Sequence, residues 1–134
     1  MPQLSDKTLE RMGSFFHLIG ASYFNPVDIG GINRDNLGEI LDLLTSDPNI
    51  EMLAIMRGIQ ARRRHHEDLV DELKLYRQAK DNYGKTLLAM FWSSAPTNDS
   101  DAIKETDAIL TGLGIPYFPT TLRAAVASRK ALQY

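Results

Sequence analysis

The chain has 134 residues, of which 43% are hydrophobic and 24% charged, so we expect one folded domain over residues 1–134 with its own core. A net charge of −2 argues against a nucleic-acid partner and against an anionic membrane surface, because such binders carry a clear basic excess. The sequence has no cysteine, no apolar run of membrane-spanning length and no signal-peptide pattern at its start, which excludes disulfides and thiolate metal sites and predicts a cytoplasmic protein.

Apolar residues recur at helical spacing in five segments of the chain. Ser5 is the expected N-cap of the first helix, and Leu4 and Leu9 stand where a hydrophobic staple would join them. Asn33 is the expected cap of the second helix. The predicted helices cover about residues 6–18, about 34–45, a stripe from 69 to 76, a stripe from 103 to 113, and about 121–132.

Three apolar runs predict strands at residues 50–56, 86–92 and 115–118. Their starts lie roughly thirty residues apart with helices between them, which is the spacing of βαβ units. The fold class is therefore predicted as α/β, a parallel sheet flanked by helices in a three-layer unit. Because the runs are nearly continuous, we expect the first strand to be covered on both faces. Two helices precede it, which is unusual for a doubly wound sheet.

Four short motifs occur in a fixed order along the chain. They are N-P-V-D-I-G-G at 25–31, D-P-N-I at 47–50, G-K-T-L at 84–87 and G-I-P-Y at 114–117, followed by an alanine-rich helix that ends in Tyr134. This order resembles the flavodoxin-like domain of NDP-forming acyl-CoA synthetases (acetate–CoA ligase, ADP-forming), which is related to the C-terminal domain of the succinyl-CoA synthetase β subunit. The resemblance extends from about Leu4 to Tyr134.

In that family a strand, a helix and a second strand precede the helix that begins here near Leu4. The resemblance therefore implies a partial, N-terminally truncated flavodoxin-like domain, either a fragment or a subunit completed by another chain. The first strand present would then have an unpaired side. Exposed strand edges recruit partners, so we expect a homo-oligomer or a partner chain there. The competing expectation is that residues 6–18 and 23–29 fold over the edge.

The family joins a carboxylate to CoA at the expense of ATP, and it relays phosphate through a histidine carried on a different domain. The resemblance implies CoA and ATP/ADP with Mg for the parent enzyme, other synthetase domains or subunits as partners, and no cofactor or catalytic residue in this chain alone. The chain would supply part of the wall of the acyl and phosphate site. The alternative is a non-catalytic regulatory or interaction module that retains the fold.

Gly58, Ile59 and Gln60 follow the first predicted strand, where the succinyl-CoA synthetase β subunit has a carboxylate-site segment, Gly-Gly-Ile-Val. Gly58 and Ile59 match it, whereas Arg57 replaces a glycine. A loop from a strand end into a helix suits an anion, because free backbone N–H groups converge there. A plain βα turn is an equally good interpretation.

Asn25, Asp28, Gly30 and Gly31 form a second candidate loop, in which the glycines could let backbone amides approach a ligand. A simple chain-reversing turn explains them equally well.

A basic patch is the third candidate, made of Arg57, Arg62, Arg63 and Arg64. Arginine binds phosphate bidentately, but a solvated helix start is the favoured interpretation. The adjacent His65 and His66 lack the spacing of a helical metal pair, so no metal site is expected.

Overall fold

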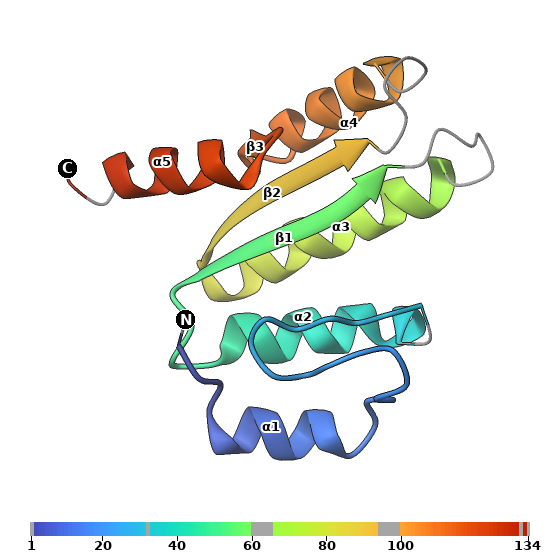
Figure 1. Cartoon of the computed structure of the whole chain (residues 1–134), viewed down its shortest axis with the longest axis vertical. Helices are drawn as coiled ribbons and strands as arrows, with labels where there is room; N and C mark the ends of the chain where they lie inside the picture. The colour runs from blue at the N-terminus through green and yellow to red at the C-terminus, as the bar shows by residue number, and fades with distance from the viewer. Residues whose placement is uncertain (1, 32, 60–65, 94–99, 132, 134) are drawn as a thin grey trace. The chain divides into compact units, whose positions relative to one another are not determined.

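The computed structural model describes residues 2–31, 33–59, 66–93, 100–131 and 133 (Figure 1). The described elements alternate between helix and strand after an all-helical start. In chain order they are α1 (Asp6–Gly13), the 3₁₀ turn η1 (Arg34–Asn36), α2 (Leu37–Ser46), β1 (Met52–Ile59), α3 (His66–Tyr83), β2 (Thr86–Ser93), α4 (Ser100–Gly112), β3 (Tyr117–Phe118) and α5 (Thr121–Ala131).

The three strands form one parallel sheet in the order β1-β2-β3, as Figure 1 shows for the neighbouring arrows of β1 and β2. The register of β2 with β3 places Ala89 opposite Tyr117 and Met90 opposite Phe118. Each connection between successive strands contains a helix, α3 or α4. The predicted α/β class with a parallel sheet and intervening helices is confirmed.

The chain divides into two compact units. We call Met1–Leu53 with Gln78–Thr86 the N-terminal unit, and Ala54–Arg77 with Leu87–Tyr134 the sheet unit. The division falls inside β1, α3 and β2, so each of these elements contributes residues to both units.

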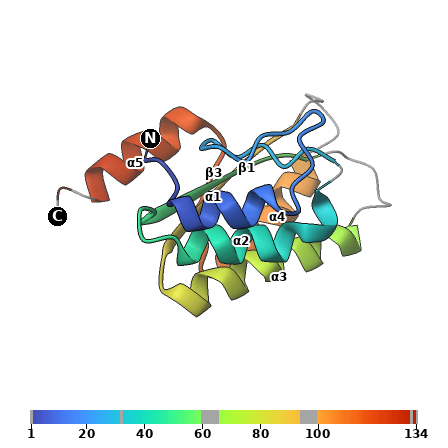
Figure 2. The ribbon, with the colours of Figure 1, turned by 90° about the horizontal axis from the view of Figure 1, so that it is seen from below.

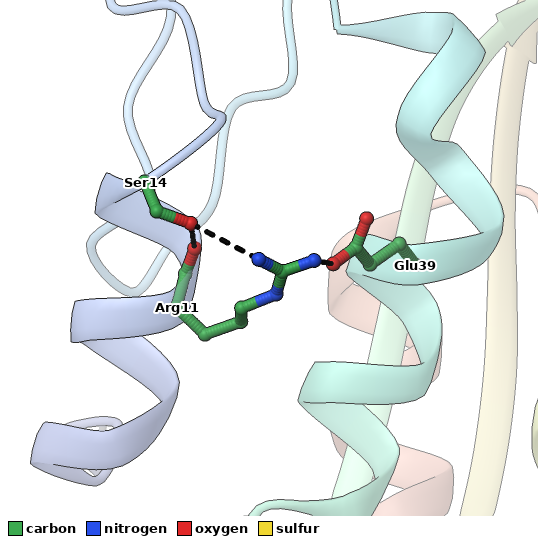
Figure 3. A network of polar contacts seen from close by, with 3 residues as sticks. All are labelled: Arg11, Ser14 and Glu39. Carbon is green, nitrogen blue, oxygen red and sulfur yellow. Dashed lines mark hydrogen bonds and ion pairs between the residues drawn. The ribbon is translucent and has the colours of Figure 1, made fainter.

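The N-terminal unit is built on α1 and α2, which lie side by side (Figure 2). Its core joins residues from both helices and from the segments beside them: Leu4, Met12, Phe16, Ile40, Leu44 and Ile50. Ser5 caps α1 as predicted, because its hydroxyl accepts the Thr8 N–H at 3.4 Å. On the exposed side, Arg11 forms an ion pair with Glu39 of α2 and donates to the Ser14 hydroxyl at 3.3 Å (Figure 3).

Helix α1 ends at Gly13, so the prediction that it continues to Leu18 was wrong. Glycine has a low helix propensity, and Ser14 follows as the C-cap. The Ser14 hydroxyl donates to the Arg11 carbonyl at 2.6 Å, a bond that competes with continuation of the helix. The apolar spacing of residues 9–19 predicted a helix five residues longer, because Phe16 is buried for another reason, as part of the segment that follows α1.

In the sheet unit, β2 is covered on both faces. Leu87, Leu88, Ala89 and Met90 are all buried. Leu88 and Met90 pack with Ala124 of α5, and Phe118 of β3 packs against this cluster. Residues with an even number therefore point from β2 toward α5, as expected from the alternation of a strand.

Strand β1 is shifted by about three residues from its predicted C-terminal bound and reaches Ile59 instead of Met56. Its side chains alternate between exposed and half-buried: Met52 and Met56 are 41% and 57% exposed, whereas Leu53 and Ile55 are half-buried. The prediction that both faces of this strand are covered was therefore wrong. An apolar run shows that a strand is hydrophobic, but it does not show which elements pack against its two faces. In the described sheet, β1 lies at the end of the strand order.

Candidate functional site

The carboxyl end of β1 carries the first predicted site. Arg57, Gly58 and Ile59 lie inside the strand and not in a loop after it, so the predicted start of the loop at Arg57 was wrong. Strand geometry alternates the two faces, and the described residues Arg57 and Gly58 accordingly differ in exposure. Gln60 lies outside the described residues.

Arg57 has an acidic partner on the helix that follows. Its guanidinium Nη2 lies 2.9 Å from Oε2 of Glu72 in α3, and both side chains are largely shielded, with 21% and 12% of their surface exposed. The other carboxylate oxygen of Glu72 accepts a hydrogen bond from the hydroxyl of the buried Tyr76. A shielded and hydrogen-bonded ion pair balances the arginine charge locally. An anion at this strand end would therefore meet a neutralised arginine.

The second predicted site, at residues 25–31, is a small loop closed on itself. The backbones of Ser22 and Asp28 exchange two hydrogen bonds of 2.8 and 2.7 Å as an isolated antiparallel bridge. The Asp28 carboxylate accepts the Gly30 N–H at 3.1 Å, and the Asn25 amide donates to the Pro2 carbonyl at 2.8 Å. The peptide bond between Asn25 and Pro26 is cis. The polar groups of this loop thus bond within the loop and to the first residues of the chain.

The two glycines of this loop differ. Gly30 has φ +54°, and a Cβ atom there would lie 3.0 Å from the Gly20 carbonyl oxygen. Only glycine adopts this left-handed conformation without strain at such a close approach. Gly31 has no atom within 4 Å of its Cβ position and no positive φ. Gly30 is therefore a requirement of the turn, whereas Gly31 leaves open space for another group.

Asn33 has a role that the sequence did not reveal. It stands at the predicted N-cap position, before the 3₁₀ turn η1, but its side chain makes no cap hydrogen bond. The side chain is fully buried; its oxygen accepts the His17 N–H at 2.8 Å, and its nitrogen donates to the carbonyls of His17 at 2.8 Å and Ile29 at 2.9 Å. An asparagine before a helix has the same sequence signature in either role, so no signal could have separated them.

Asp47 holds the start of α1 beside the end of α2. Its carboxylate accepts the backbone N–H and the hydroxyl of Ser5, both at 2.9 Å, and the Asn49 N–H at 2.8 Å. Burial would raise the pKa of Asp47, but hydrogen bonds from Thr8, Asn49 and Ser5 together outweigh it and hold that pKa below its usual value. The residues D-P-N predicted a turn, which is confirmed; the long-range bond to Ser5 required the tertiary fold.

The predicted groups belong to different units of the chain. Arg57 and Gly58 lie in the sheet unit, whereas Asn25, Asp28, Gly30 and Gly31 lie in the N-terminal unit. Arg62, Arg63 and Arg64 lie outside the described residues, and His66 begins α3. Over the described part of the chain, no group of three or more His, Asp or Glu side chains is arranged to hold a metal ion.

Comparisons with known proteins give a structural neighbour. PH0766 from Pyrococcus horikoshii OT3, known from a crystal structure, is similar to this chain with a TM-score of 0.68 and 25% sequence identity over 90% of this chain. The chain spans 26% of the length of that protein. No protein-family model matches the sequence, and no curated protein matches it either. Within the described residues, no helix has both the length and the apolar character needed to cross a bilayer.

Proposed function

We propose that this chain is a domain or fragment of an NDP-forming acyl-CoA synthetase, an acid–thiol ligase that converts a carboxylate, CoA and ATP into acyl-CoA, ADP and phosphate. In this role the chain supplies part of the wall of the acyl and phosphate site and an interface to other domains or subunits. The phosphate-relaying histidine and the CoA- and ATP-binding domains would lie elsewhere in the parent enzyme. CoA and ATP/ADP with Mg would therefore act in the assembled enzyme and not on this chain alone.

The observation that carries the proposal is the placement of the family's motifs at turns that need them. Gly30 of the N-P-V-D-I-G-G motif, Gly84 of G-K-T-L and Gly114 of G-I-P-Y all have positive φ, at +54°, +63° and +65°. The D-P-N motif ends α2 and is followed by β1. Gly84 joins α3 to β2 and Gly114 joins α4 to β3, and a chance match of short motifs would not be expected to fall repeatedly at left-handed turns. The likeness to PH0766 over 90% of the chain supports the same fold assignment.

The proposed anion site begins at Gly58 and Ile59 and includes Gln60. Gly58 has no side chain to block a ligand, and the carboxyl end of a parallel strand is where anions bind in α/β folds. Because Glu72 already balances Arg57, backbone N–H groups would provide the main attraction for a carboxylate or phosphate. The second loop, with Asn25, Asp28, Gly30 and Gly31, is proposed as a support for this site.

A non-catalytic regulatory or interaction module is the second candidate, favoured by the same ion pair. Where the family has a glycine, Arg57 fills the position with a side chain and Glu72 anchors it. Such a pair reduces the room and the positive potential available to an acyl substrate. In that case the fold would be retained while the anion site is closed.

Backbone amide shifts during titration with inorganic phosphate, a short carboxylate and CoA distinguish the two candidates. For the ligase domain we expect shifts centred on Gly58 and Ile59, and a clear loss of these shifts in Gly58→Val, where a side chain fills the site. Leu122→Val, a change at an exposed position of α5, is the matched control and should leave the titration unchanged. Absence of shifts at β1 with all three ligands would contradict the ligase assignment and favour the regulatory module.

An activity measurement completes the test. The purified 134-residue chain should form no acyl-CoA from acetate, CoA and ATP, because the proposed role assigns the chemistry to other domains. Detectable acyl-CoA would contradict the proposal that this chain is catalytically incomplete.

A further inference from the structure

Helix α5 packs on the sheet through a small side chain and directs its larger apolar side chains away from it. Ala124 is buried and packs with Leu88 and Met90 of β2. Leu122 and Val126 are 73% and 48% exposed. Each of them is two positions from Ala124, and residues two positions apart in an α-helix lie about 200° apart around its axis. Leu122 and Val126 therefore lie on the face of α5 opposite the sheet.

This outer face belongs to the sheet unit taken by itself. Thr121–Ala131 lies entirely in that unit, and so do the residues of β2 on which it packs. Leu122 and Val126 are four positions apart, so their side chains are neighbours on the helix surface and form one apolar stripe. A helix with apolar residues on two opposite sides is normally covered on both of them. The stripe on α5 therefore indicates a second packing partner.

The charges on α5 all have one sign. Residues 119–134 contain Arg123, Arg129 and Lys130 but no aspartate or glutamate, although the whole chain has a net charge of −2. All three side chains are exposed. Arg123 and Lys130 are seven positions apart, so they lie on the same flank of the stripe, and Arg129 extends the stripe three positions after Val126. Positive charge thus borders the stripe on one flank and at its C-terminal end.

Neither a second copy of α5 nor a bilayer matches this face. In the antiparallel pair that joins Leu122 of one copy to Val126 of the other, Arg123 would face Arg123 of the second copy. In a parallel pair, Arg129 would face Arg129 of the second copy. Both arrangements bring like charges together, which opposes association. An anionic bilayer needs a larger apolar face, because the strength of membrane binding scales with the apolar area that is buried.

We propose that the outer face of α5 docks an acidic amphipathic helix of a different protein. The apolar side of that helix covers Leu122 and Val126, and its aspartate or glutamate side chains pair with Arg123, Arg129 and Lys130. The apolar stripe provides the contact, and the surrounding charge determines which helix is accepted. This inference goes beyond the proposed function and does not rest on it, since it involves neither β1 nor the loop at residues 25–31.

Titration of the full chain with two synthetic peptides tests the proposal. The acidic peptide is an amphipathic helix with leucine at positions a and d and glutamate at e and g of each heptad, and the matched peptide has lysine in place of every glutamate. Fluorescence anisotropy at low salt should show about tenfold tighter binding of the acidic peptide, with backbone amide shifts centred on Leu122 and Val126. Equal binding of the two peptides, shifts outside α5, or no binding of the acidic peptide up to about 1 mM would overturn the proposal.

Substitutions on α5 separate the apolar contribution from the charge. Leu122→Ala combined with Val126→Ala should weaken binding of the acidic peptide by about tenfold, whereas Met56→Ala, at another exposed position of the sheet unit, should not change it. Arg123→Glu combined with Lys130→Glu should reverse the preference, so that the lysine peptide binds more tightly. All five positions are exposed, so circular dichroism should show the wild-type fold in every variant. An unchanged preference after the charge reversal would contradict the proposal.

Vesicles that contain phosphatidylserine provide the comparison with a membrane surface. We expect the chain to stay in the supernatant when these vesicles are sedimented at physiological salt, because the stripe on α5 is short. Sedimentation of the chain with the vesicles, together with no measurable binding of the acidic peptide, would overturn the proposal and identify α5 as a helix that faces a membrane.

Discussion

In the N-terminal unit, buried polar side chains hold irregular backbone: Asn33 bonds three groups of His17 and Ile29, and Asp47 bonds Ser5 and Asn49. In the sheet unit, the buried residues of β2 are apolar, and the strand ladder itself satisfies the backbone. Residues 14–33 of the first unit form a long segment without helix or strand, so its backbone groups need side-chain partners.

The two units also differ in how their backbone groups are paired. In the N-terminal unit, the loop at residues 22–30 turns back and pairs with itself. In the sheet unit, β1 ends the strand order of the described sheet, and the apolar side chain of Met56 is exposed. The loop thus satisfies its own backbone through local polar contacts, whereas the strands of the sheet satisfy theirs by pairing with one another.

Truncating the core of each unit gives the largest expected effect. Met12→Ala in the N-terminal unit and Leu87→Ala in the sheet unit remove fully buried side chains and should each lower the free energy of unfolding by about 2–5 kcal/mol. Because β1, α3 and β2 contribute residues to both units, we expect one cooperative transition in urea, measured by circular dichroism and amide spectra. Native amide shifts persisting in one unit while the other unfolds would contradict this. Leu122→Ala, at an exposed position, should change little.

Removing the side chain of Asn33, which bonds the backbone of His17 and Ile29, should lower the free energy of unfolding almost as much. Asn33→Ala leaves three backbone groups without their partner in a buried place, so we expect a loss of about 3 kcal/mol in urea unfolding. Asn36→Ala is the matched control, because Asn36 precedes α2 without a side-chain cap bond. It should change stability by less than about 0.5 kcal/mol. Similar losses in both variants would mean that Asn33 acts only as an ordinary residue before a helix.

Asp47 should give a smaller, pH-dependent effect. Its pKa is lowered in the folded chain, so the ionised form stabilises folding at neutral pH. Asp47→Asn should therefore lower the free energy of unfolding by about 1–2 kcal/mol at pH 7. The difference from the wild type should shrink once the pH falls below about 4, the pKa of aspartate in the unfolded chain, and should vanish below the lower pKa of the folded chain. Asp42→Asn, on the exposed side of the same helix, is the control. A difference independent of pH down to about pH 2 would contradict the assigned bonds.

Substitutions at the two glycines of the loop at residues 25–31 should change the stability least, but the two variants should differ clearly from each other. Gly30→Ala forces a Cβ atom to 3.0 Å from the Gly20 carbonyl oxygen at φ +54°, so we expect a loss of about 1–2 kcal/mol. Gly31→Ala meets no atom within 4 Å and should be nearly neutral. Thermal unfolding of both variants measures the difference, and equal losses would show that the loop can rearrange.

Helical and strand periodicity in the sequence determined the order of the elements, because each burial pattern depends on residues that are neighbours in the chain. Ser5 as a cap, the turn at Asp47 and the parallel sheet followed from such local patterns. The predicted end of α1 was wrong, because Phe16 is buried as part of the segment after α1 and not on a helix face. Arg57, one member of the candidate basic patch, is paired with Glu72, a residue fifteen positions away that no local pattern connects to it.

The sequence by itself determined the α/β class, the cap at Ser5 and the turn at Asp47. Only the tertiary structure decided that the Asn33 side chain forms a buried bridge, that β1 ends the strand order of the described sheet with one face exposed, and that Glu72 balances Arg57. The physical reason is the same in each case. Hydrogen-bond and burial partners that lie far apart in the chain are chosen by packing, and packing is not encoded in the spacing of any one segment.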